Sequence, residues 1–226
     1  FLIKKIGVEE SKVKMRAQQL YKGIYQKGIT SFSDLTTVTF ELRKKLDNVL
    51  SLELPKILKT EVAVDKTIKW LLELNDENKN LIEVVLIPSK SHNTICVSVQ
   101  VGCAMSKNSA CIHCATGTQL LVKNLSASEI VMQMMIAKRH LNDFGDQRIL
   151  SRVVLMGSGE PLTNYKETKQ FIKILMEPEG IHMGKKSITL STIGVPDKII
   201  QFTDEVGVHL ALSIHAGTNE KRNKII

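Results

Sequence analysis

The amino-acid sequence predicts an α/β fold, in which a small N-terminal helical domain and a connecting β-hairpin precede a parallel (βα) sheet or partial barrel. Two patterns predict it. Short apolar strand patterns alternate with helical ones from residue 94 onward, whereas the first 50 residues show helical periodicity alone. We therefore expect a helical domain over 1–57, a β-hairpin over 58–93 and a βα core over 94–226.

The N-terminal helical pattern has one apolar stripe at the spacing of a helix face. The stripe consists of Val13, Ala17, Leu20 and Ile24. Gly28 is a plausible stop signal. A second helix is expected over 32–50, and Pro55 closes this domain.

The remaining elements follow from changes in periodicity. Alternating residues predict hairpin strands near 62–72 and 81–87, joined by a polar turn at 75–78. The core strands are expected at 95–101, 153–156, 187–190 and 208–214, and the core helices at 129–141, 166–176 and 197–202. Ser126 or Ser128 could cap the first of these helices. Chemistry in such folds gathers at the carboxyl ends of the strands.

The net charge, the apolar runs and the two ends of the chain indicate its partner, its location and the extent of the parent protein. Lys and Arg number 31 against 23 acidic residues, a net charge of +8, which suits a polyanionic partner but also fits a plain basic protein. The longest apolar runs are too short for a membrane span, so a cytoplasmic protein without a membrane partner is expected. Because the chain begins at Phe1 and ends just after the charged stretch 219–224, we expect a longer parent protein, truncated here at its C-terminus.

Four cysteines lie within one stretch of 19 residues, which predicts a reduced compartment and a metal site rather than a disulfide scaffold. Cys103, Cys111 and Cys114 could ligate three irons of a cubane cluster and leave the fourth iron open. A zinc knuckle that recruits His113 or Cys96 fits the same loop. Cys96 lies in a predicted strand, where a buried small side chain is the commoner role.

Polar residues follow several of the predicted strands. The glycines at 157 and 159 allow a ligand to approach the backbone, and Glu160 could accept a hydrogen bond from an ammonium group. Ser191, Ser213 and His215 lie at or near other strand ends. Each could be structural on its own, but together they describe one pocket.

Five segments in order resemble the RlmN/Cfr family of radical S-adenosylmethionine enzymes, which methylate adenine in RNA. They are 103–117, 123–125, 157–162, 189–192 and 212–216, and the stretch 16–21 resembles the family's small RNA-binding domain. The resemblance implies a radical S-adenosylmethionine barrel with a [4Fe–4S] cluster on the three cysteines. It also implies Glu83 as the general base. The implied binding residues for S-adenosylmethionine are Gly159, Glu160, Ser191, Ser213, Ile214 and His215.

The resemblance also implies a substrate and partners. The expected reaction methylates C2 of an adenine in 23S rRNA and in tRNA, with electrons from an external flavodoxin-type donor, by a monomeric enzyme. A relative in the family alkylates C8 of the same adenine, and the motifs do not separate C2 from C8. A zinc-stabilised RNA-binding protein and a radical enzyme with a small-molecule substrate also fit parts of the sequence.

Three features depart from the family pattern. The cysteine spacing is C-x7-C-x2-C rather than C-x3-C-x2-C, so residues 106–110 are expected to bulge outward or to mark a copy with a weak or absent cluster. Ser158 stands where the family usually has Met. The family's methyl-carrying cysteine lies in a C-terminal third, and no cysteine follows Cys114 here. The chain as given is therefore expected to bind both cofactors without completing methyl transfer.

Overall fold

A seven-stranded mixed sheet organises the computed structural model, which describes residues 1–107, 111–145 and 148–226. In sheet order the strands are β1 (Lys56–Val62), β2 (Ile68–Glu73), β3 (Leu81–Ile87), β4 (Asn93–Cys96), β7 (Leu150–Leu155), β8 (Ile188–Thr192) and β9 (His209–Leu212). The first four pair antiparallel, and β4, β7, β8 and β9 pair parallel. The predicted α/β fold with a parallel sheet is confirmed.

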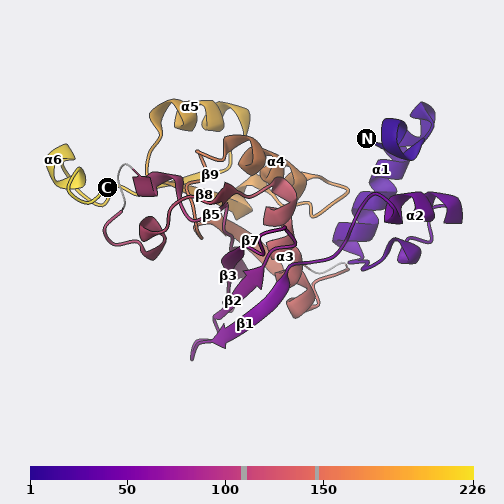
Figure 1. Cartoon of the computed structure of the whole chain (residues 1–226), viewed down its shortest axis with the longest axis horizontal. Helices are drawn as coiled ribbons and strands as arrows, with labels where there is room; N and C mark the ends of the chain where they lie inside the picture. The colour runs from indigo at the N-terminus through magenta and orange to yellow at the C-terminus, as the bar shows by residue number, and fades with distance from the viewer. Residues whose placement is uncertain (108–110, 146–147) are drawn as a thin grey trace.

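A second sheet and the helices complete the architecture. Short strands β5 (Gln100–Val101) and β6 (Lys123–Asn124) pair antiparallel outside the main sheet. The helices are α1 (Val13–Tyr21), α2 (Phe40–Asp47), α3 (Ala127–Leu141), α4 (Tyr165–Met176), α5 (Pro196–Glu205) and α6 (Asn219–Arg222). Helices α3, α4 and α5 connect the successive parallel strands, while α1 and α2 lie at one end of the molecule and α6 at the other (Figure 1).

Three predicted elements were wrong in detail. The helix expected over 32–50 is a 3₁₀ turn, Phe32–Asp34, followed by α2, because Ser31 and Thr39 each cap a separate start. The predicted strand 62–72 contains a turn at 63–67, so β1, β2 and β3 form three antiparallel strands instead of a hairpin. The strand predicted over 95–101 leaves the main sheet after Cys96, and its last two residues form β5.

Two apolar cores hold these elements together. The larger core joins the buried faces of the sheet strands to α3, α4 and α5 through residues such as Ile95, Met134 and Phe171. The smaller core lies among the N-terminal helical segments and consists of Ile6, Val8, Phe32 and Leu46. Burial of these apolar side chains is the main stabilising term for both parts. In the described part of the chain, no helix has the length and apolar character needed to cross a membrane.

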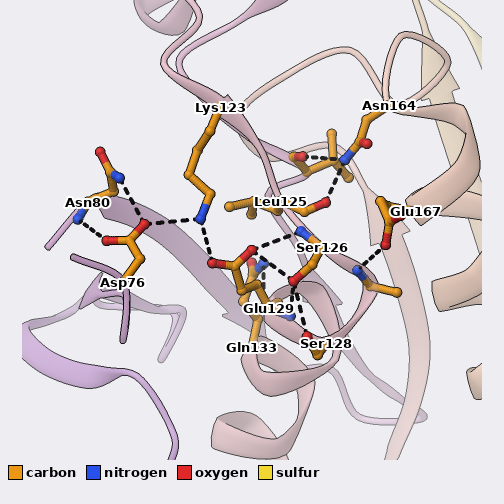
Figure 2. Close-up of polar contacts among 12 residues, drawn as sticks. Asp76, Asn80, Lys123, Leu125, Ser126, Ser128, Glu129, Gln133, Asn164 and Glu167 are labelled. Carbon is orange, nitrogen blue, oxygen red and sulfur yellow. Dashed lines mark hydrogen bonds and ion pairs between the residues drawn. The ribbon is translucent and has the colours of Figure 1, made fainter. Parts of the chain in front are cut away.

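A polar network fastens the antiparallel strands to the start of α3 (Figure 2). Lys123 Nζ lies 3.0 Å from an Asp76 oxygen in the turn between β2 and β3, and 2.7 Å from Glu129 Oε1. Glu129 also completes a capping box with Ser126, so Ser126 rather than Ser128 is the N-cap of α3. Burial alone would raise the pKa of Asp76, but hydrogen bonds from Asn80 and Lys123 lower it to about 2.

We predict that Asp76→Asn removes a pH-dependent part of the folding stability. Because the pKa of Asp76 is lower in the folded chain than in the unfolded one, its contribution is present above pH ~4 and is lost as the pH falls toward ~2. Urea unfolding should show the wild type losing about 1 to 2 kcal/mol more than Asp76→Asn over that range. Glu77→Gln, in the same turn but outside this network, should follow the wild type. Parallel pH profiles for wild type and Asp76→Asn would contradict the assignment.

Candidate active site

The candidate site lies where the four parallel strands end. Their carboxyl ends share one edge of the sheet, so the segments that follow them are neighbours. The cysteine loop contacts two of these segments. Thr116 Oγ1 lies 3.4 Å from Ser158 Oγ, and the His113 and His215 ring centroids are 4.2 Å apart. Three segments that are distant in sequence therefore meet at this edge.

The cysteine loop is closed at its base. Cys103 forms an isolated bridge with Leu120, and its backbone N–H donates to the Gln119 carbonyl over 3.2 Å. Gly102 has φ +75°, and a Cβ there would lie 2.1 Å from the Leu120 carbonyl oxygen, so only glycine fits this crossing. The Cys114 N–H donates to the Cys111 carbonyl over 2.9 Å, which forms a tight turn between these two cysteines.

The loop's three thiols influence one another electrostatically. Burial raises the pKa of Cys103, and the nearby Cys114, Glu160 and Cys111 raise it further. Burial and Cys114 likewise raise the pKa of Cys111. All three thiols are free and partly exposed. Three neighbouring thiols on one loop form a possible donor set, because a metal that binds a thiol displaces its proton and leaves a thiolate ligand.

This donor set fits a polynuclear cluster. In a cubane cluster each cysteine binds a different iron. Three free cysteines on one closed loop match that donor set in number and in chemistry.

The longer spacing between Cys103 and Cys111 begins with a 3₁₀ turn, Ala104–Lys107. The sequence predicts that Ser106 bulges outward, but its hydroxyl donates to the Cys103 carbonyl over 2.7 Å. The first inserted residue therefore folds back onto the cysteine. The other residues that carry this expectation, 108–110, lie outside the described residues.

Glu160 joins the ends of β7 and β8. The residue is 3% exposed, and its two carboxylate oxygens accept from the Leu162 and Ile193 N–H groups, each over 3.0 Å. Each oxygen keeps a further lone pair that an ammonium group could use. Gly159 has φ +102°, and a Cβ there would lie 2.6 Å from the Gln100 Cβ, so glycine lets these two segments approach.

The other predicted binding residues lie on β8 and after β9. Ser191 pairs with Ala211 in the parallel ladder, and the Ser213 N–H donates to the Thr192 carbonyl over 2.9 Å. Ile214 and His215 follow, both exposed. His215 has φ +58°, a left-handed conformation that is costly for a residue with a side chain and that clusters at functional sites.

Glu83 lies farther along the sheet, on β3. Its side chain is 52% exposed and forms an ion pair of 3.1 Å with Lys69. Its backbone carbonyl accepts from Ser98 Oγ over 2.6 Å, and the same hydroxyl accepts from the Ser158 N–H over 3.0 Å. Ser98 therefore connects the Glu83 strand to the loop after β7, while the carboxylate remains accessible.

Several buried polar residues at this edge were not predicted from the sequence. Gln133 holds the Ser98 backbone through hydrogen bonds of 2.8 and 2.9 Å, and Asn164 donates to the Val99 and Leu125 carbonyls (Figure 2 labels Gln133, Leu125 and Asn164). Gln100 belongs to the same group. The sequence does contain a signal for two of these residues. Ser98 and Gln100 alternate with three valines in a predicted buried strand, and buried polar residues require specific hydrogen-bond partners.

Comparisons with known proteins agree with this arrangement. Residues 97–226 match the family model "Radical SAM superfamily", and residues 6–52 match "Ribosomal RNA large subunit methyltransferase N-terminal domain". The chain is 39% identical, over 98% of its length, to "Dual-specificity RNA methyltransferase RlmN" of Rhodopseudomonas palustris strain BisB18. This chain belongs to the RlmN family. The protein of the same name from Dinoroseobacter shibae is 40% identical to this RlmN-family chain over 97% of the chain.

The RlmN-family chain spans 57% and 56% of the lengths of those two relatives. Its fold resembles a radical SAM methyltransferase from Sphaerobacter thermophilus, with a TM-score of 0.84 and 34% identity, covering 94% of this chain and 61% of that one. The predicted partial radical S-adenosylmethionine barrel is thereby confirmed. Enzymes of this superfamily use a [4Fe–4S] cluster and S-adenosylmethionine, which confirms the predicted cofactors.

We predict that Gly159→Ala destabilises the chain more than Gly194→Ala does. Both glycines have φ near +105°, but a Cβ at 194 meets its nearest atom at an ordinary 3.5 Å, whereas one at 159 overlaps Gln100. We expect a loss of about 2 to 4 kcal/mol at 159 and about 1 to 2 kcal/mol at 194 in denaturant unfolding. Equal losses would mean that backbone strain alone, and not the close approach to Gln100, requires Gly159.

Proposed function

We propose that this chain carries the cluster-binding and S-adenosylmethionine-binding part of an enzyme that methylates C2 of an adenine in 23S rRNA and in tRNA. The observation that carries the proposal is the contact of the cysteine loop with both the loop after β7 and the end of β9. The relatives' name, dual-specificity RNA methyltransferase, supports the reaction class. The net charge of +8 suits an RNA substrate.

Different residues of the chain would bind the cluster and S-adenosylmethionine. Cys103, Cys111 and Cys114 would bind three irons of the cluster. When bound, the cluster supplies the electron that splits S-adenosylmethionine. Gly159 and Glu160 would receive the ammonium group, which a buried carboxylate attracts strongly. The remaining contacts would come from Ser191 and the segment 213–215, which lie beside each other at the ends of β8 and β9.

Glu83 is proposed as the base that removes the adenine proton. Its carboxylate is half exposed, so an RNA base can reach it, and its ion pair with Lys69 holds it at a defined place on β3. An external flavodoxin-type donor would supply electrons.

Cysteine replacements test the cluster assignment. We expect the chain, reconstituted without oxygen, to hold about four irons and four sulfides, and Cys103→Ala, Cys111→Ala or Cys114→Ala to lose most of them because each removes one of three ligands. Cys96→Ala is the control, since Cys96 lies on β4 and should leave the iron content unchanged. One bound zinc in place of iron would instead support a zinc-stabilised RNA-binding protein.

Replacement of Glu83 tests the proposed base in the full-length protein. Glu83→Gln should keep iron and S-adenosylmethionine binding but slow adenine methylation of a 23S rRNA fragment by about 100-fold or more, because the amide cannot accept the proton. Glu61→Gln is the matched control, since Glu61 also pairs with Lys69, over 3.0 Å. Unchanged methylation by Glu83→Gln would exclude Glu83 as the base. Product analysis of the adenine separates C2 from C8 methylation.

A further inference from the structure

Gln100 occupies the centre of the site and has no role in the proposed chemistry. Its side chain is fully buried, and its amide makes four hydrogen bonds, the full capacity of a glutamine side chain with two lone pairs and two N–H groups. The oxygen accepts from the Ala104 N–H over 3.1 Å and from the Glu160 N–H over 2.9 Å. The nitrogen donates to Asn124 over 2.7 Å and to Thr163 over 2.9 Å.

The two bonds to the oxygen connect the two halves of the site. Ala104 directly follows Cys103, the first cysteine of the loop, and Glu160 is the buried carboxylate after β7. One oxygen atom therefore joins the backbone beside the first cysteine to the backbone of Glu160. Gly159 makes this arrangement possible, because a Cβ at position 159 would occupy the space that the Gln100 side chain fills.

The path of the backbone around Gln100 brings its side-chain amide between the cysteine loop and the loop after β7. Cys96 is the last residue of β4, and Gln100 pairs with Asn124 in the separate two-stranded sheet, so the ladder of the main sheet does not set the position of Gln100. The Val99 and Gln100 N–H groups both donate to the Ser158 carbonyl, over 2.9 and 3.1 Å, which brings the Gln100 side chain against the loop after β7. The bond from the Glu160 N–H is buried, and a buried hydrogen bond is costly to leave unmade.

We propose that Gln100 is a positioning residue that sets the cysteine loop and Glu160 at the separation a single bound S-adenosylmethionine requires. This rests on the proposed function, in which one ligand contacts both the cluster and Glu160. Gln100 acts through Ala104 and Glu160 and touches no reacting atom. Its loss should therefore lower affinity for S-adenosylmethionine and change how the cluster responds to it, without removing a cluster ligand.

Gln100→Leu tests the proposal in the reconstituted chain. Leucine has a similar size but leaves the Ala104 and Glu160 N–H groups unpaired. We expect near wild-type iron content, at least about tenfold weaker binding of S-adenosylmethionine by equilibrium dialysis, and a reduced or absent change in the electron paramagnetic resonance spectrum of the reduced cluster when the ligand is added. Gln100→Glu keeps an acceptor for both N–H groups but loses the donors to Asn124 and Thr163, so it should bind S-adenosylmethionine more tightly than Gln100→Leu and less tightly than the wild type.

The matched control is Gln133→Leu, the same substitution at another fully buried glutamine, which binds the Ser98 backbone and neither Ala104 nor Glu160. It should lower stability but leave affinity within about threefold of the wild type. If Gln100→Leu does not fold, Ala104→Pro removes one of the two linking N–H groups at a first helical position that tolerates proline. It should keep the iron and weaken S-adenosylmethionine binding.

Outcomes for this inference and for the proposed function are distinct. Wild-type affinity and spectral response in Gln100→Leu, or in Ala104→Pro if the first variant does not fold, would overturn the positioning role alone. Equal loss of affinity in Gln100→Leu and Gln133→Leu would also overturn it, because a general structural effect would then suffice. A wild-type chain that binds neither iron nor S-adenosylmethionine would overturn the proposed function together with this inference.

Discussion

Parallel pairing of β4, β7, β8 and β9 is the constraint on which the site depends. Strands that run in one direction must end at one edge, so the cysteine loop, the loop after β7 and the ends of β8 and β9 become neighbours. The helices between the strands make this direction possible, because a parallel connection must cross back over the sheet. The apolar core under α3, α4 and α5 thus holds the chemistry-bearing segments together, and Leu162 of the loop after β7 is part of it.

At that edge, backbone N–H and C=O groups also lose their hydrogen-bond partners in the strand ladder. Backbone groups that leave the ladder at a buried position need partners, and polar side chains supply them. Gln133 satisfies Ser98, Asn164 satisfies Val99 and Leu125, and Glu160 satisfies Leu162 and Ile193. These side chains satisfy the buried backbone at this edge, whereas the link between the cysteine loop and the Glu160 backbone is made by Gln100.

The antiparallel strands continue the sheet beyond β4. Glu83 lies on β3 and is joined to the loop after β7 through the Ser98 hydroxyl and the Ser158 N–H. The Lys123 network anchors the turn between β2 and β3 to α3, so these strands are fixed to the core at both their sheet pairing and their turn. Glu83 is therefore held by the sheet while its carboxylate remains exposed, which is what its proposed role as a base for an RNA substrate requires.

The sequence by itself determined the alternation of strands and helices, and it narrowed the N-cap of α3 to two serines. It also supplied the candidate residues for the chemistry, because periodicity, capping chemistry and thiol spacing are local properties. The errors of the sequence-based prediction were also local. The single helix predicted over 32–50 overlooked the second N-cap at Thr39, and the single strand predicted over 95–101 overlooked the end of β4 at Cys96. Only the tertiary structure decided which of these residues touch. The His113 contact with His215, three of the four bonds of Gln100 and the room that Gly159 leaves for it join segments tens of residues apart. No local sequence pattern encodes such contacts.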